Sequence, residues 1–447
     1  MKRSRWWSIE VIGMVSATDI AVGLIAWAFS VHLPLVYTVL GLGGWLLPTL
    51  ELIGHRRNRQ VYVELAHNMA NYLITVYAIG GLFGTIITVF LAGLLPIFTN
   101  IAGALLWPVW GGIAIAFGVA IALPFIGFYY RSFGRVSPVK HVAIGYGMAI
   151  ALTVIPAMFR LVFAFINYPA GVEVFKDETS IVGFTLGINW SQVFLNPTYI
   201  PLFLATLFGA IAMTGVLMNS IFGWRYAVDR SEYRLTGYRI SNWVSLVFGV
   251  LYAVFAGLYL YEVYLYSPPT VAWSIFGKPP AYLPSSLYPV YEPTMMLTGV
   301  FYMDVALGAI LLILITLSLK FINRPISALK LVLVLLLMVS AEVMNGLAHL
   351  PYAIVPPPLS AVPVLVKAYG LQFTLQVADT LKVSTLLTPP QLNALLQLVS
   401  VEPGLLYGSL VVFAFFNALL LYIIYAALSW KWVPPQVIRL RNRDRPP

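Results

Sequence analysis

The chain contains no cysteine, and only 9% of its 447 residues are charged. The absence of cysteine excludes disulfides, thiolate-ligated zinc and iron–sulfur clusters, so any metal would need His, Met or carboxylate ligands. The scarcity of charge excludes a soluble globular protein, because such domains carry about 25% charged residues. It also excludes a disordered chain, which combines low hydrophobicity with high charge.

Apolar residues make up 60% of the chain, which indicates lipid as its solvent. A helix that spans a bilayer needs ~20 mostly apolar residues. Nine segments meet this condition, at residues 20–53, 65–95, 101–130, 139–166, 199–224, 240–264, 295–321, 331–354 and 405–430. We therefore predict an all-α, polytopic transmembrane helix bundle in the cell membrane, with residues 1–447 forming a single integral membrane domain.

The net charge of +10 comes from Lys and Arg in the short segments between the apolar runs. This placement sets membrane orientation, so we predict no nucleic-acid partner. The segments that follow the odd-numbered spans hold 18 basic residues, and the opposite side holds seven. Basic loops face the cytoplasm, which predicts an outside N-terminus and a cytoplasmic C-terminus.

Three segments on the predicted outer side are longer than plain turns and rich in Pro and aromatic residues, at residues 169–197, 267–293 and 355–403. We expect them to lie on the outer membrane face, with short interfacial helices within residues 377–398. Residues 1–19 begin like a signal peptide, but Asp19 interrupts the apolar run and no clear cleavage site follows. We predict that they are retained as an interfacial segment.

Ionisable residues inside the predicted spans are functional candidates, because leaving them in lipid costs free energy. The main candidates are His32, Glu51, Arg160, Asp304, Glu342 and His349. His32 is a candidate axial ligand for haem iron, or otherwise a polar residue beside Pro34 that bonds to a neighbouring helix. Glu342 and His349 are seven residues apart and so share one helix face, which we expect to pack against a cofactor, a water chain or a partner.

The remaining candidates have simpler structural interpretations. Glu51, like Glu64 and His67, lies near a predicted cytoplasmic end, and we expect it to pair at the surface with the arginines of residues 56–59. Arg160 keeps its proton and therefore needs an acceptor. Asp304 and Glu342 are candidate partners, either in a structural ion pair or beside a haem propionate or proton path.

Five motifs occur in order along most of the chain. They are a first-span His and Pro followed by an acidic end (residues 31–51), a Lys-His before a small-residue helix (138–143), an Asn-Pro that opens the fifth span (194–197), the outer string WSIFGKP (273–279) and the string HLPY after span eight (349–352). In this order they resemble subunit I of cytochrome bd quinol oxidase. The resemblance implies an oxidoreductase subunit of an aerobic respiratory chain, with haem as cofactor and quinol as substrate of the complex.

Several family positions differ in this chain. His32 matches the family's first-span haem-ligating His, but the His that holds the low-spin haem falls on Ala205 and its Met partner falls on about Asp304. Gly346 takes the place of the Glu that ligates the high-spin haem, and Glu342, one turn away, is a candidate substitute. Trp107 and Phe117 occupy roughly the places of two glutamates on the family's proton path.

These departures imply a diverged subunit that pairs, as a heterodimer, with a haem-bearing subunit I-like protein, an arrangement known in archaeal bd-type oxidases. It would hold one haem, at His32, or none. A second hypothesis is a catalytic subunit with ligands rearranged among His32, Asp304, Glu342 and His349. A third is a membrane transporter, against which the chain shows no inverted halves.

Overall fold

The computed structural model of the chain describes residues 28, 32–94, 105–168, 170–176, 184–285, 288, 292–293, 296–353 and 418. These residues are nearly all helical, as the composition predicts. Seven of the helices are long and apolar enough to cross a membrane: His32–Arg56, Leu105–Ser132, Pro138–Phe165, Tyr199–Tyr226, Glu232–Tyr266, Thr298–Leu317 and Arg324–Ala341.

The helices agree with the first eight predicted spans where the structure describes them. The first span ends in α2 (Leu47–Arg56), and the others contain α3 (Gln60–Leu94), α5 (Leu123–Ser132), α6 (Pro138–Asn167), α8 (Tyr199–Tyr226), α9 (Glu232–Tyr266), α12 (Thr298–Leu317) and α13 (Arg324–Ala353). The ninth span, apart from residue 418, lies outside the described residues, as do residues 1–19 and 355–403. The count of nine spans therefore stays a prediction.

Two of the spanning helices contain π-helical segments that the sequence pattern did not indicate. The first span passes through η1 (Leu42–Leu46), and the third passes through η2 (Pro108–Ile115) and η3 (Phe117–Ala122) before α5 begins. A π-helical turn places an extra residue within the helix and re-aims the side chains that follow it. In the first span, η1 directly precedes the helix that carries Glu51.

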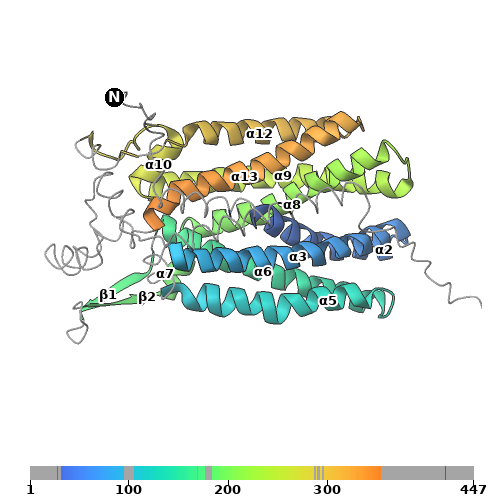
Figure 1. Ribbon diagram of the computed structural model, residues 1–447, viewed down its shortest axis with the longest axis horizontal. Coiled ribbons are helices and arrows are strands. Elements are labelled where there is room, and N and C mark those ends of the chain that lie inside the picture. Colours follow the sequence, from blue (N-terminus) through green and yellow to red (C-terminus); the bar gives the residue numbers. More distant parts are fainter. Residues whose placement is uncertain are drawn as a thin grey trace, which may run out of the picture.

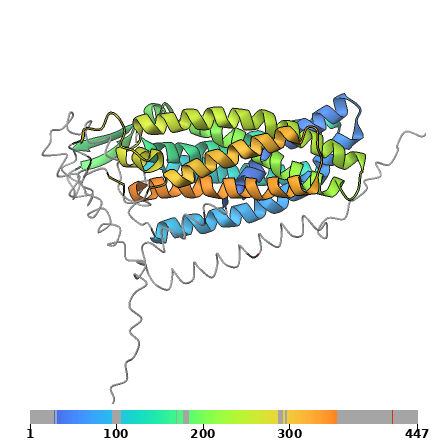
Figure 2. The same cartoon turned by 90° about the horizontal axis from the view of Figure 1, so that it is seen from above.

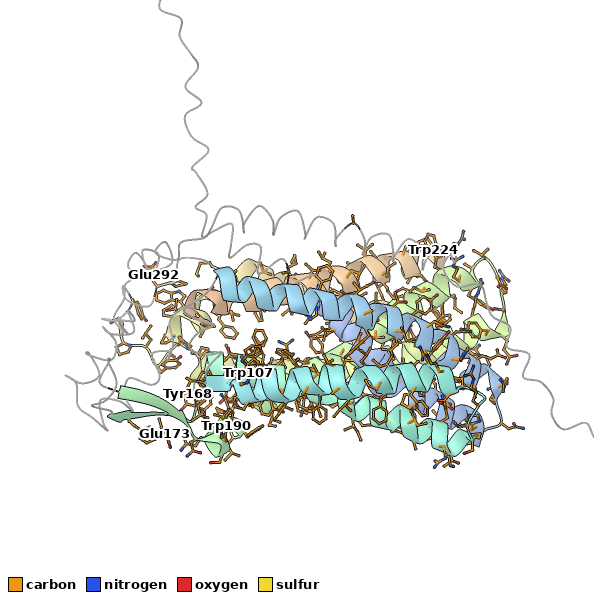
Figure 3. The ribbon with its side chains drawn as sticks, turned by 60° about the horizontal axis from the view of Figure 1, so that its bottom comes forward. Trp107, Tyr168, Glu173, Trp190, Trp224 and Glu292 are labelled. Carbon is orange, nitrogen blue, oxygen red and sulfur yellow. The ribbon has the colours of Figure 1, made fainter. Side chains whose placement is uncertain are left out.

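The long helices lie side by side along one axis of the molecule (Figures 1 and 2). The turns α2–α3, α5–α6, α8–α9 and α12–α13 all lie at one end, which we name the basic end because it carries the arginines at residues 56–59, 131–135, 225–234 and 324. Tyr168 and Trp190 lie toward the opposite end and Trp224 toward the basic end (Figure 3). Aromatic residues at both ends are typical of the two membrane–water interfaces.

The end opposite the basic end contains a β-hairpin, where the sequence indicated only a segment on the membrane face. Strands β1 (Val172–Lys176) and β2 (Phe184–Ile188) are antiparallel, with Val172 opposite Ile188. The Asn189 N–H donates to the Gly171 carbonyl at 2.7 Å, and Gly171 takes a positive φ of 83° at the base of the hairpin. The short helices α7 (Trp190–Phe194) and α10 (Pro269–Phe276) lie at the same end.

The first span joins two packed groups of helices. Residues from its later part, such as Leu47, pack in one core with α3, α5 and α6, while Leu33 and Tyr37 pack in another with α8, α12 and α13. Its contact with α8 is close: the Thr214 hydroxyl donates to the Tyr37 carbonyl at 3.0 Å. A Cβ added at Gly41 would lie 2.7 Å from the Ala210 carbonyl oxygen. Small residues permit such close approach between membrane helices.

A buried lysine joins four elements near the basic end. Lys330 of α13 is fully buried, and its ammonium donates to the Ser318 hydroxyl at 2.7 Å and to the Asn219 side-chain oxygen. The Tyr238 hydroxyl of α9 donates to the carbonyls of Ser318 and Phe321. Because lipid offers no hydrogen-bond partner, this network keeps the cation satisfied inside the bundle.

We expect Gly41→Ala to destabilise the protein by about 1–3 kcal/mol, because the new methyl group would overlap the α8 backbone at Ala210. Unfolding in detergent, followed by circular dichroism, measures the loss. Gly257→Ala is the matched control, since an added Cβ there meets no atom within 4 Å. Equal stability of the two variants would contradict the close contact between the first span and α8.

Candidate functional site

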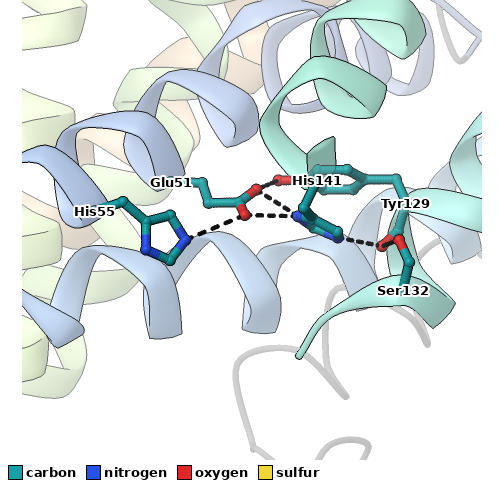
Figure 4. Close-up of polar contacts among 5 residues, drawn as sticks. All are labelled: Glu51, His55, Tyr129, Ser132 and His141. Atoms are coloured by element: carbon teal, nitrogen blue, oxygen red, sulfur yellow. Dashed lines mark hydrogen bonds and ion pairs between the residues drawn. The ribbon is translucent and has the colours of Figure 1, made fainter. Parts of the chain in front are cut away.

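The Glu51 carboxylate is the centre of a buried polar cluster near the basic end (Figure 4). Glu51 is 1% exposed and His141, in the first turn of α6, is 2% exposed. The His141 Nδ1 atom lies 2.6 Å from Glu51 Oε1 and 2.7 Å from Oε2. The Tyr129 hydroxyl of α5 donates to Oε2 at 3.0 Å, so three helices meet at one carboxylate.

Aromatic rings enclose this cluster on the side of α5. The Tyr129 ring stacks on the His141 ring with centroids 4.5 Å apart, and Phe133 packs against His141 at 4.2 Å. Phe133 also makes an edge contact with His67 of α3, at 4.6 Å. The rings exclude water from the carboxylate, which strengthens its interactions.

The expectation that Glu51 pairs at the surface with the arginines of residues 56–59 is wrong. Glu51 is on the buried face of α2, whereas those arginines are exposed around the turn beyond it. Arg59 pairs instead with Glu232 of α9, with 3.2 Å between nitrogen and oxygen. Only His55, one turn after Glu51, approaches it from the same helix, with its Nε2 3.4 Å from Oε1.

His141 was not among the ionisable candidates from the sequence. His141 belongs to the Lys-His motif of residues 138–143, and its partner Glu51 is distant in the chain. The signal that could have found it is the pairing of two isolated ionisable residues near the same predicted membrane boundary, since each needs a partner there.

His32 lies in the first spanning helix, and its Nδ1 atom is buried with no hydrogen-bond partner in the part of the chain that the structure describes. A Cβ added at Gly84 of α3 would lie 3.4 Å from the His32 Cε1 atom, so the ring is close to the α3 backbone. An unpaired imidazole nitrogen in an apolar bundle fits the chemistry of an axial ligand to haem iron. Across the described residues, no three His, Asp or Glu side chains are grouped to hold a metal ion directly.

The remaining predicted site residues are distributed over α6, α12 and α13. The Ser340 hydroxyl of α13 donates to Asp304 Oδ1, while Oδ2 of Asp304 is buried without a partner within the described residues. The Arg160 guanidinium lies over the Phe163 ring, 5.2 Å from its centroid. Glu342 and His349 both lie in α13, and their side chains are outside the described part of the structure. Their roles stay predictions.

Comparisons with known proteins identify the fold and the family. A model of the cytochrome bd terminal oxidase subunit I family matches residues 23–274, more than half of the chain. The chain is similar to the solved bd oxidase from Geobacillus thermodenitrificans, with a TM-score of 0.59 and 18% identity, covering 90% of this chain and 98% of that chain. No curated protein matches it. The family is embedded in membranes, which agrees with the seven candidate spans.

We expect Glu51→Ala to cost about 3–5 kcal/mol of unfolding free energy, because it leaves His141 and Tyr129 buried without their acceptor. Glu232→Ala is the matched control: its side chain is 75% exposed in the pair with Arg59, so its loss should cost less than about 1 kcal/mol. Denaturant unfolding of the two variants in detergent measures the difference. A small cost at Glu51 would mean that the carboxylate does not hold the three helices together.

Proposed function

Because this chain belongs to the cytochrome bd terminal oxidase subunit I family, we propose that it is a diverged subunit of a bd-type quinol:oxygen oxidoreductase complex. In this proposal it pairs with a haem-bearing subunit I-like protein, and quinol binds at the level of the complex. The family membership supports the complex. The side chains at the expected haem positions support the assignment of most or all of the haem to the partner chain.

The observation that carries this proposal is the loss of iron-ligating chemistry at two positions. The resemblance puts the low-spin haem ligand at Ala205, which is buried in α8, and the high-spin haem ligand at Gly346 of α13. A methyl group and a hydrogen atom cannot ligate iron, so these positions favour a companion subunit over a chain that holds three haems.

His32 is the residue that would hold a haem in this chain, since its imidazole has a free, buried Nδ1 atom within the described structure. Haem, when bound, supplies the electron-transfer and oxygen chemistry of this family. The chain's own contribution would be the His32 imidazole as a ligand and the apolar helices that exclude water around it.

Counting the haem in each separated subunit tests which of the two chains holds it. We expect the partner, co-purified with this chain, to carry all of the haem or all but one, and this chain to hold at most one. Pyridine haemochrome spectra of each separated subunit give the count. Two or three haems in the isolated chain would contradict the proposal and favour a catalytic subunit with rearranged ligands.

If one haem is present, His32→Ala should remove it from this chain, whereas His67→Ala should leave it bound. His67 is the matched control because it is also a buried histidine of a spanning helix, and its ring contacts Tyr130 and Phe133 instead. The haem absorbance per chain measures the result. Retention of the haem in His32→Ala would exclude His32 as its ligand.

A further inference from the structure

Three of the chain's five histidines gather near the Glu51 carboxylate. His141 is bonded to it, His55 is 3.4 Å from it, and His67 is joined to His141 through the shared Phe133 ring. Histidine is the side chain that exchanges protons near neutral pH. None of these histidines takes a haem-ligand position in the proposed function, so their clustering needs a separate explanation.

The hydrogen bonds determine how many protons the Glu51–His141 pair holds. The His141 Nε2 atom lies 2.8 Å from the Tyr129 backbone carbonyl, which can only accept, so Nε2 carries a hydrogen. Nδ1 faces both carboxylate oxygens at 2.6 and 2.7 Å. A bare lone pair at that distance from a carboxylate would be repelled, so one further proton lies between the two side chains.

His55 provides the route between this shared proton and water. Its side chain is 35% exposed at the last turn of α2, and Nε2 is just beyond hydrogen-bond distance from Glu51 Oε1. On the side of α5 the pair is covered by the rings of Tyr129 and Phe133. Within the part of the chain that the structure describes, His55 is the part-exposed imidazole that approaches the buried carboxylate from the basic end.

The other ionisable groups around the pair cannot replace this route. Tyr129 donates to Glu51 Oε2, and Phe133 lies between His67 and His141. Lys140 is exposed to solvent. Tyr146 of α6 bonds with Thr49 and not with the carboxylate. Among the described residues, no second carboxylate contacts His55 or His141.

We propose that Glu51 and His141 form a one-proton binding site that exchanges with the basic end through His55. The observed distances describe the loaded site. When the site is empty, Glu51 is a carboxylate, His141 is neutral with its hydrogen on Nε2, and repulsion between the carboxylate and the Nδ1 lone pair moves the two side chains apart. Loading transfers the proton of a protonated His55 from Nε2 to Glu51 Oε1, where it is shared with His141 Nδ1, and leaves His55 neutral. Resting on the proposed function, this site gives the chain a part in the proton uptake that oxygen reduction requires.

The charge of purified variants tests whether the site is loaded. A loaded pair is neutral, so Glu51→Gln should leave the net charge at its wild-type value in native electrophoresis at about pH 7, where histidines exchange protons. Glu232→Gln, which removes a carboxylate whose side chain is 75% exposed, should make the net charge more positive. A net charge raised equally by both substitutions would mean that Glu51 is an unprotonated carboxylate beside a neutral histidine, and would overturn the proposal.

Proton exchange tests the route through His55. With ¹⁵N-labelled histidine, the nuclear magnetic resonance signal of the His141 Nδ1 proton should exchange with deuterated water several-fold more slowly in His55→Gln than in wild type. Arg57→Gln is the control, since that exposed residue lies next to the turn and makes no contact with Glu51 within the described structure. Both variants should unfold at the wild-type temperature. Slower exchange in His55→Gln would then be due to the loss of the route through His55 and not to misfolding.

If the His141 Nδ1 proton exchanges at the wild-type rate in folded His55→Gln, the proposed route through His55 is wrong. This test remains valid if Glu51→Gln fails to fold. Both measurements use the purified chain and need no haem or oxidase activity, so they stand apart from the haem count. In the assembled complex, His55→Gln should slow oxygen consumption most at low pH, where a protonated His55 delivers the proton in wild type, while Arg57→Gln should follow the wild-type profile. If proton exchange is slowed in His55→Gln but the pH profile of oxygen consumption is unchanged, the proton site takes no part in oxygen reduction. That result would contradict the proposal.

Discussion

The hydrocarbon of a bilayer offers no hydrogen bonds, and this single constraint explains where the polar residues of this chain lie. Each buried polar side chain must find its partner within the protein. Lys330 meets the requirement with Asn219 and Ser318, and Glu51 meets it with His141 and Tyr129. In both cases the partners come from different helices, so satisfying the polar group also fixes how the helices pack near the basic end.

The same constraint explains which parts of the fold are predictable from sequence. Apolar runs of spanning length and intervening basic turns are local features. They located both ends of α6 and α8 to within two residues, whereas α3 and α9 begin five and eight residues before the predicted spans. The sequence did not indicate the β-hairpin, because its two strands have only five residues each and their pairing joins residues that are up to 16 positions apart. The π-helical segments were missed because apolar residues on all sides leave no periodicity that would reveal an extra residue in a turn.

The sequence identified Glu51 but neither of the histidines that lie beside it, His141 and His55. Polarity within a span was sufficient to select Glu51, His32 and Asp304. Nearby arginines then suggested a partner for Glu51, but sequence proximity is a poor guide when the carboxylate is on the buried helix face. Its true partner, His141, is on another helix. Only the packing of α2 against α6, which depends on contacts spread over the whole bundle, brings them together.

The chain lacks iron-ligating side chains at two expected positions, whereas another part of the same bundle holds a cluster of ionisable side chains. Ala205 and Gly346 stand where the resemblance expects iron ligands, whereas Glu51 is hydrogen-bonded to His141 and has His55 3.4 Å away. Apolar residues of similar volume often stabilise a helix contact as well as a buried ion pair does. The position of Glu51 and His141 next to the part-exposed His55 therefore favours proton exchange in addition to their role in helix packing.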